Sequence, residues 1–298
     1  MDAEVFRAWM TSAAEVIHAN RDYLTALDAA IGDADHGINL DRGFTAALRA
    51  LNARNGAAVR MTPGRILTVT GSTIVSEVGG AAGPLYGVAF RRAGHALGAA
   101  TDVDLSALSA ALEAALAGIQ ELGAAREGDK TMVDALQAAL GGFRQAIAAG
   151  ASQDDALSVL AEAASAAAIA TIPMQALKGR ASYLGSRSVG HQDPGATSAA
   201  LICGALRDAA RAMTLTVPGP RRQVSADKAA SPRPAPMSLE TARAASVTRA
   251  ATESRVPGDS SRPAAPTTPM APATTPSRAK MGAARPASPT VASWSSMA

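Results

Sequence analysis

Apolar residues recur at spacings of three and four along the first 217 residues, whereas the alternation typical of half-buried strands is nearly absent. One such stripe consists of Leu105, Leu108, Leu112, Leu116 and Ile119. The pattern predicts an all-α protein with eight helices. We expect them at residues 3–20, 38–53, 63–77, 84–99, 104–122, 131–149, 153–170 and 195–213. Asp104, and either Ser152 or Asp154, are the predicted N-caps of two of them.

The connections between these predicted helices fall into two alternating groups. The first group (54–62, 100–103 and 150–152) carries no unusual chemistry. Every distinctive motif lies in the second group, at residues 21–37, 78–83, 123–130 and 171–194. In an up-and-down helical array, successive connections alternate between the two ends. The sequence therefore predicts that the second group meets at one end and forms one composite site.

The richest stretch contains Asp28, Asp33 and Asp35, followed by His36 and Asn39. Three carboxylates this close repel one another unless a cation lies between them, and hard divalent cations prefer oxygen ligands. Aspartate and glycine are also common in solvated turns and caps, which would be the better interpretation of a single Asp-Gly pair. The whole cluster favours a metal site. An EF-hand is excluded, because the twelfth position counted from Asp33 is a phenylalanine rather than glutamate.

Two further connections are rich in small residues. Ser76 is followed by Gly79 and Gly80, where backbone N–H groups can approach a phosphate near the next helix start; close helix packing explains the glycines equally well. The next connection runs from Gly123 through Asp-Lys130 to Thr131 and Met132. Neither stretch has the Gly-Lys-Ser/Thr ending of a Walker A loop. We expect the Thr131 hydroxyl to be free at a helix start and Lys130, taken alone, to be a solvated charge.

The connection 171–194 is long, polar and glycine-bearing, with little of its own to pack. Long connections in compact domains are usually functional or disordered. Arg180 suits a pair of phosphate oxygens, with a surface ion pair as the alternative. Asp193-Pro-Gly195 is predicted to be a turn that begins the last helix, where helix capping is the alternative role for Asp193.

Composition changes near residue 217. Residues 218–298 contain 13 of the 17 prolines, 11 basic residues and four acidic residues, which gives a formal charge of +7 against −4 for residues 1–217. This segment cannot bury enough apolar surface to offset the entropy of ordering it. We expect a folded domain at 1–217 and a disordered tail at 218–298. A solvated linker is favoured over nucleic-acid binding, because the tail lacks a dense basic block and interleaved aromatics.

Cys203 is the single cysteine, so no intrachain disulfide can form, and it lies in an apolar run where burial is expected. The N-terminus has no secretion-signal pattern, and no uncharged apolar run of about 18 residues is present. We therefore expect a cytoplasmic protein without a membrane span.

Taken together, the motifs resemble the nucleotide-binding L subunit of dihydroxyacetone kinase. The resemblance runs in order from about residue 3 to residue 213 and rests on five stretches, Ile-Gly-Asp-Ala-Asp-His-Gly, Val-Gly-Gly-Ala-Ala-Gly-Pro-Leu-Tyr-Gly, Gly-Asp-Lys-Thr-Met, Lys-Gly-Arg-Ala-Ser-Tyr-Leu-Gly and Gly-His-Gln-Asp-Pro-Gly-Ala. It implies an eight-helix antiparallel barrel with the nucleotide at one rim. The tail lies outside it.

The resemblance also implies site roles. Asp28, Asp33 and Asp35 would hold two Mg²⁺ ions that bind the phosphates of ADP or ATP. The implied nucleotide-site residues are His36, Asn39, Ser76, Gly79, Gly80, Gly123, Thr131, Met132, Arg180, Asp193 and Gly195.

The function implied is phosphoryl transfer to dihydroxyacetone, or a related small ketose, held on a separate K subunit. The donor is either exchangeable ATP or a phosphotransferase-system M subunit that rephosphorylates bound ADP, and a free-standing L subunit favours the second. The alternative function is a nucleotide-sensing subunit that binds a transcription regulator. Retention of all three aspartates favours transfer.

Overall fold

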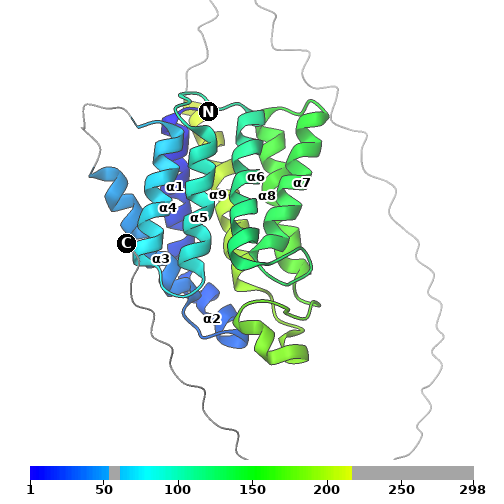
Figure 1. Cartoon of the computed structure of the whole chain (residues 1–298). Helices are drawn as coiled ribbons and strands as arrows, with labels where there is room; N and C mark the ends of the chain where they lie inside the picture. The colour runs from blue at the N-terminus through cyan, green and yellow to red at the C-terminus, as the bar shows by residue number, and fades with distance from the viewer. Residues whose placement is uncertain (54–60, 217–298) are drawn as a thin grey trace, which may run out of the picture. The chain divides into compact units, whose positions relative to one another are not determined.

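The computed structural model describes residues 1–53 and 61–216, and this part of the chain contains nine α-helices and one 3-10 helix (Figure 1). The predicted tail at 218–298 lies outside the described residues. The helices are α1 (Ala3–Ala19), α2 (Arg21–Ile31), α3 (His36–Asn52), α4 (Pro63–Glu77), α5 (Ala82–Leu97), α6 (Leu105–Gly123), α7 (Met132–Ala148), α8 (Gln153–Ala170), η1 (Arg180–Ser188) and α9 (Pro194–Thr216).

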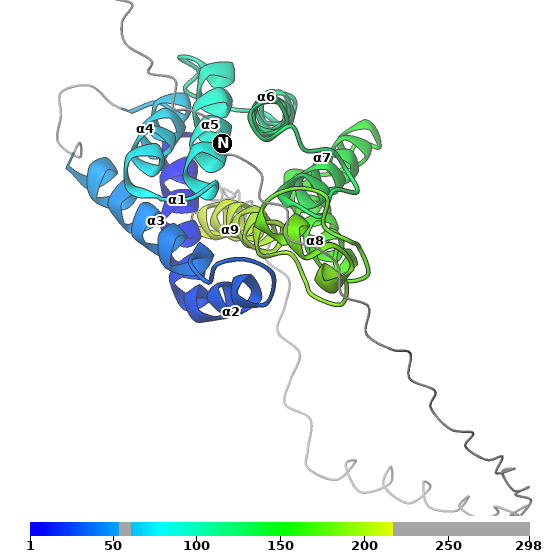
Figure 2. The same cartoon turned by 60° about the horizontal axis from the view of Figure 1, so that its bottom comes forward.

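Eight of these helices form a closed ring. Each of α4 to α9 packs against the α-helix before it, α3 packs against α1, and α9 returns to pack against α1. Figure 2, with the lower end of Figure 1 turned forward, shows this circuit. The predicted all-α, eight-helix barrel is therefore confirmed.

Aromatic and aliphatic side chains fill the interior. The Phe90 ring lies 6.0 Å from the Trp9 ring and 6.0 Å from the Phe44 ring, which joins α5 to α1 and α3. The Trp9 indole N–H donates to the Ile202 carbonyl at 3.0 Å and so ties α1 to α9. Cys203 is buried in the same core, as expected.

The predicted helix starts at Asp104 and Ser152 are confirmed. Asp104 accepts a hydrogen bond from the Ala107 N–H at 2.7 Å, and Ser152 accepts one from the Asp155 N–H at 3.2 Å. The alternative cap, Asp154, instead lies inside the first turn of α8 and pairs with Arg211.

One prediction is wrong. The connection at 21–37 was expected to be a loop, but residues 21–31 form α2. Leu24, Asp28 and Ile31 are its buried face, with helical spacing. The periodicity is masked in the sequence because an aspartate occupies the middle of the apolar stripe. Helix α2 covers the edge of one end of the ring (Figure 2).

Among the described helices, α6 alone is long and apolar enough to cross a membrane. This is a weak indication, because core helices of other proteins pass the same test. In the ring α6 packs between α5 and α7, and its Glu121 and Glu113 form ion pairs with Arg92 of α5 and Arg144 of α7.

The ring places the motif-bearing connections together. Residues 32–35, 78–81, 124–131 and 171–193 lie at the end that is lowest in Figure 1, whereas the N-terminus lies at the other end. There the Met1 ammonium forms an ion pair with Asp102 at 2.7 Å.

Candidate functional site

A pocket opens at the end of the ring where these connections meet. All four of them contribute to its wall. Its lining includes eleven of the fourteen residues singled out from the sequence, namely Asp28, Asp33, Asp35, His36, Gly79, Gly80, Thr131, Met132, Arg180, Asp193 and Gly195. The pocket wall also includes Ile31, Leu85, Lys130 and Lys178, which are not among the site residues expected from the sequence.

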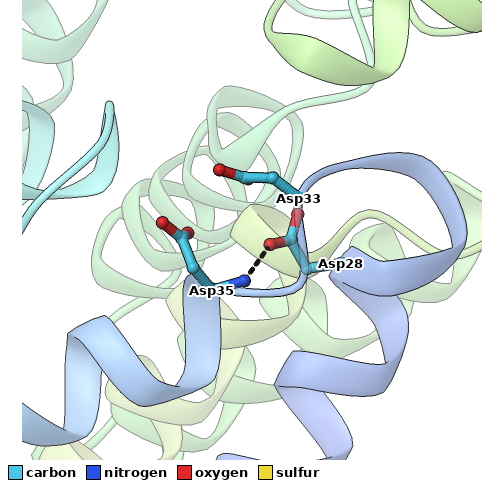
Figure 3. Close-up of side chains that lie close together, drawn as sticks. All are labelled: Asp28, Asp33 and Asp35. Atoms are coloured by element: carbon cyan, nitrogen blue, oxygen red, sulfur yellow. Dashed lines mark hydrogen bonds between the residues drawn. The ribbon is translucent and has the colours of Figure 1, made fainter.

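Three carboxylates cluster in this pocket (Figure 3). Asp28 lies on α2, and Asp33 and Asp35 lie between α2 and α3. One ligand oxygen from each lies within 4.8 Å of the others. The Asp28 Oδ2 atom accepts hydrogen bonds from the backbone N–H groups of Asp35, at 2.9 Å, and His36, at 3.1 Å. Asp28 therefore folds the connection back so that the other two carboxylates face the same space.

Gly32 is needed for this fold-back. A Cβ atom at position 32 would lie 1.9 Å from the Asp28 Oδ1 atom, well inside van der Waals contact. A side chain there would displace the buried carboxylate. The glycine therefore preserves the acidic cluster.

The donor set fits a hard divalent cation. All the donors are carboxylate oxygens, which magnesium and calcium prefer over nitrogen or sulfur. The cluster combines the buried Asp28 with the more accessible Asp33 and Asp35, so an ion can enter from the pocket side. A cation also relieves the mutual repulsion of three carboxylates.

Arg180 faces this cluster from the opposite wall. Its Nη2 atom lies 3.1 Å from the Asp33 Oδ2 atom, and both side chains are partly exposed. The ion pair links η1 to the connection that follows α2. The alternative role for Arg180, a surface ion pair, thus exists in the structure, and it occurs at the pocket itself.

The His36 side chain is held from behind. Its Nε2 atom lies 2.9 Å from the Ser198 hydroxyl, which lies 2.7 Å from the Tyr86 hydroxyl. Ser198 also donates to the Gly195 carbonyl at 3.0 Å. Burial lowers the pKa of His36, and the nearby Asp28 and Asp35 oppose that shift. Ser198 and Tyr86 were not singled out from the sequence, because a serine and a tyrosine on apolar helix faces give no signal of this kind.

The glycine connection forms another part of the wall. Gly79 and Gly80 line the pocket, and Gly80 has a φ of +67°, a conformation that glycine adopts without strain. Asn39 lies behind this wall and accepts from Arg42 Nη2 at 2.9 Å, while Arg42 Nε donates to the Glu77 carbonyl at 2.7 Å. Arg42 thereby fixes the end of α4 just before the glycines.

Besides Asn39, two other predicted site residues, Ser76 and Gly123, lie outside the pocket lining. Ser76 is in the last turn of α4, where its hydroxyl donates to the Thr73 carbonyl at 2.9 Å. Gly123 is the last residue of α6, and a Cβ there would meet only the Leu85 side chain, at 3.3 Å.

Two expectations for the third connection are wrong. The Thr131 hydroxyl is not free, because it accepts from the Val133 N–H at 3.1 Å as the N-cap of α7, and Asp134 completes a capping box. Lys130 is not solvated, because its side chain is 1% exposed. Lys130 has a left-handed backbone just before the N-cap of α7, and its side chain is directed into the protein. The spacing of residues in the sequence does not reveal this direction.

The fourth connection has more structure than expected. It contains η1, and its Ala176 and Ala181 pack with Ile31 of α2 in a small cluster separate from the barrel core. It ends at Asp193, which is buried and whose Oδ2 accepts from the Ala196 N–H at 2.6 Å. The capping role therefore holds. Burial raises the pKa of Asp193 to about 7.

The chain was compared with known proteins. A family model described as the DAK2 domain matches residues 30–208. The ADP-binding subunit DhaL of the PEP-dependent dihydroxyacetone kinase of Escherichia coli is 44% identical over 190 residues, which cover 64% of this chain and 89% of that protein. The ADP-binding subunit DhaL of the PTS-dependent dihydroxyacetone kinase of Lactococcus lactis is 40% identical over 194 residues, which cover 65% of this chain and 91% of that protein.

A solved structure has the same fold. The dihydroxyacetone kinase of C. freundii in complex with AMP-PNP and Mg²⁺ aligns with a TM-score of 0.52 and 26% sequence identity, over 70% of this chain and 34% of that chain. This chain therefore corresponds to about a third of that kinase. The family model spans more than half of the chain and the relatives match over nearly their whole length, so the chain belongs to the DAK2-domain family, within the group of DhaL subunits of dihydroxyacetone kinases.

Proposed function

We propose that this chain is the nucleotide-binding subunit of a cytoplasmic dihydroxyacetone kinase. It transfers the phosphoryl group of a Mg²⁺-bound nucleotide to dihydroxyacetone, or a related small ketose, held on a separate K subunit. The observation that carries the proposal is the pocket in which a three-carboxylate cluster, Arg180 and a glycine connection face one space. The names of the E. coli and L. lactis relatives, both ADP-binding kinase subunits, support it.

In this proposal Asp28, Asp33 and Asp35 hold two Mg²⁺ ions. Bound magnesium supplies charge neutralisation of the phosphates and orients the transferred group, so little covalent chemistry is asked of the protein. The protein's own contribution is positioning. Asp28 is fixed by two backbone N–H groups, which sets the spacing of the other two carboxylates.

The remaining pocket residues enclose the nucleotide. Gly79 and Gly80 allow phosphate oxygens to approach the backbone, where any side chain would intrude. His36, held by Ser198, presents one edge of its ring to the pocket. The other proposed contacts are Thr131, Met132, Arg180, Asp193 and Gly195, which line the pocket. Asn39, Ser76 and Gly123, also implied by the resemblance, lie outside that lining, and no direct contact is proposed for them.

The K subunit docks at the same end of the barrel, because the transferred phosphoryl group must reach a sugar outside this chain. Exposed apolar side chains surround that end, among them Leu177, Tyr183 and Val189 of the fourth connection. Large exposed apolar groups beside a site are typical of protein interfaces. This chain thus supplies the nucleotide half of a composite active site.

The phosphate donor is proposed to be a phosphoprotein. The E. coli and L. lactis relatives are named as PEP-dependent and PTS-dependent kinase subunits. In that route ADP stays bound to this chain and is rephosphorylated by an M subunit of the phosphotransferase system. The same names concern kinase subunits and give no support to the alternative function, a nucleotide-sensing partner of a transcription regulator.

The test begins with the purified chain. Its bound nucleotide is released by denaturation and identified, and exchange with free labelled ATP is followed. Transfer to dihydroxyacetone is then measured with a K subunit, using either ATP or a phosphorylated M subunit as donor. We expect retained ADP, slow exchange, and transfer only with the K subunit and the phosphoprotein.

A matched pair of variants links the result to the pocket. Asp35→Asn removes a carboxylate from the cluster and should abolish transfer. Asp41→Asn removes a carboxylate that lies six residues later in the chain, on α3, and outside the pocket lining, where it pairs with His18 at 3.0 Å. This variant should leave transfer unchanged. Robust phosphorylation by this chain without a K subunit, or equal losses in the two variants, would overturn the proposal.

A further inference from the structure

Lys130 is the one lysine whose side chain is buried in the described part of the chain, and its charge is saturated with hydrogen bonds. The ammonium donates to the carbonyls of Met174 at 3.0 Å, Ser188 at 2.7 Å and His191 at 2.5 Å. A lysine ammonium has three donors, and all three are used here. Each acceptor belongs to the single connection at 171–193.

Burying an ammonium is costly unless it is hydrogen-bonded or paired. Burial lowers the pKa of Lys130, while the nearby Asp193 opposes that shift. The backbone at Lys130 also has a φ of +61°, a value that residues other than glycine rarely adopt. A buried ammonium and a positive φ are both unfavourable, so the surrounding contacts must stabilise Lys130 in this conformation. The contact between the third connection, at Lys130, and the fourth connection is therefore a specific one.

The fourth connection has few other attachments to the barrel. The Leu177 N–H donates to the Asp129 carbonyl at 3.1 Å, beside Lys130, and the Gln192 Nε2 atom donates to the Thr197 hydroxyl of α9 at 2.8 Å. Its apolar packing is limited to a small cluster with Ile31. Removing the Lys130 ammonium would leave three carbonyls without their donor and release the middle of the connection.

The same connection supplies one wall of the pocket. Lys178, Gly179 and Arg180 line it, and Arg180 forms the ion pair with Asp33. The Lys130 ammonium therefore sits behind the wall that carries Arg180. It acts on the pocket through the backbone of that wall.

We propose that Lys130 is a positioning residue that latches the connection 171–193 across the pocket, keeps Arg180 opposite Asp33, and thereby slows the release of bound nucleotide. This inference rests on the proposed nucleotide-binding function. It adds a determinant of nucleotide retention that is separate from the metal cluster.

The experiment uses the full chain and has two readouts. The first is the rate of trypsin cleavage within the connection, where Lys178, Arg180 and Arg187 provide sites; this readout needs no nucleotide. The second is the dissociation rate of a fluorescent ADP analogue in the presence of Mg²⁺. Lys130→Met keeps the length of the side chain and removes its donors. We expect it to raise both rates at least about tenfold, which corresponds to about 1.4 kcal/mol.

Two controls isolate the latch. Arg144→Met removes a basic side chain from α7, the helix that follows Lys130, where Arg144 pairs with Glu113 of α6 outside the pocket lining, and should change neither rate. In a double-mutant cycle, Lys130→Met in an Arg180→Ala background should raise the dissociation rate by less than about twofold, because the latch acts through Arg180. A Lys130 role in general stability alone would give additive effects.

The outcomes separate the two proposals. Faster cleavage with no measurable ADP binding in the unaltered chain would support the latch as a structural device and overturn the proposed function. Unchanged cleavage, or faster cleavage with an unchanged dissociation rate, would overturn the latch alone. Should Lys130→Met fail to fold, Lys130→Gln replaces the three-donor ammonium with a shorter, uncharged amide that cannot reproduce all three hydrogen bonds; wild-type rates in that folded variant would also overturn the latch.

Discussion

The Arg180 guanidinium and the Asp33 carboxylate meet across the pocket, with 3.1 Å between Nη2 and Oδ2. The two residues are far apart in the chain, and they belong to the connections after α2 and after α8. The ion pair therefore closes the site from both sides. It also places a permanent positive charge beside a carboxylate that we propose as a metal ligand, where phosphate oxygens would compete for the same guanidinium.

Replacing Arg180 should separate binding from stability. Arg180→Ala should weaken Mg·ADP binding about 10- to 100-fold, because hydrogen bonds to charged groups contribute about 1.5–3 kcal/mol. The unfolding free energy should change by less than about 1 kcal/mol, since the pair is partly exposed. Calorimetric titration with ADP and a thermal melt provide the two measurements. Arg187→Ala, an exposed arginine in η1, is the matched control and should bind ADP normally.

Two aspartates of the cluster should behave differently when truncated. Asp33→Ala should abolish transfer and weaken Mg·ADP binding, yet leave the metal-free fold as stable or more stable, because carboxylate repulsion is relieved. Asp28→Ala should lose the same function and also destabilise the fold by about 1–3 kcal/mol, because two backbone N–H groups lose their acceptor.

These two variants are compared by calorimetry with and without Mg²⁺ and by denaturant unfolding of the metal-free proteins. A destabilised Asp33→Ala protein that still binds Mg·ADP normally would mean that the acidic stretch is a turn and cap rather than a metal site.

Much of the fold followed from periodicity, and the alternation of connections indicated which end carries the site. The eight ring helices are predicted because each is 15 residues or longer and has a mostly apolar buried face, in which single polar residues such as Asn39 of α3 and Asp134 of α7 do not hide the period. Helix α2 was missed because its buried face includes Asp28, an acidic residue that helical periodicity counts as polar. Asp28 is buried there because its carboxylate accepts the backbone N–H groups of Asp35 and His36, and periodicity alone does not reveal those partners.

The role of a site residue was harder to predict from the sequence where that role depends on the direction in which its side chain points. Lys130 and Thr131 are adjacent, and the sequence predicts a solvated ammonium at the first and a free hydroxyl at the second. The capping box occupies the Thr131 hydroxyl, and Lys130, whose backbone is left-handed, is buried. Ser198 and Tyr86, which hold His36, come from helices far apart in the chain, so only the folded structure brings them together.

The buried Asp193 should make stability depend on pH. Its carboxyl keeps a proton up to about pH 7 in the folded protein, whereas in the unfolded chain it loses the proton near pH 4. Between these values the folded state binds more protons, so this group's contribution to stability falls as the pH rises. Asp193→Asn cannot titrate.

The melting temperature of Asp193→Asn, relative to the unaltered chain at the same pH, should therefore rise between about pH 4 and pH 7. Each kcal/mol corresponds to roughly 2–4 °C for a domain of this size. Melts of both proteins without nucleotide measure the difference. A difference that stays constant across this range would contradict the raised pKa.

The docking surface of the K subunit is testable through Tyr183, whose side chain is 87% exposed on η1 at the pocket end. A large apolar side chain left this open is expected to be covered by a partner. Tyr183→Asp should weaken association with a K subunit by about tenfold or more, since central aromatic side chains often contribute 2 kcal/mol or more to an interface. Binding of Mg·ADP to the isolated chain should be unchanged, because Tyr183 is outside the pocket lining.

Leu215 provides the matched control for that experiment. It is 81% exposed and lies near the end of α9, at the opposite end of the barrel. Leu215→Asp should leave association with the K subunit unchanged, because the transferred phosphoryl group leaves the barrel at the other end. Association is measured by titration of one subunit into the other, and transfer by turnover at saturating ADP. If Leu215→Asp weakens association and Tyr183→Asp does not, the K subunit docks away from the pocket, and direct transfer between the two subunits in that geometry is excluded.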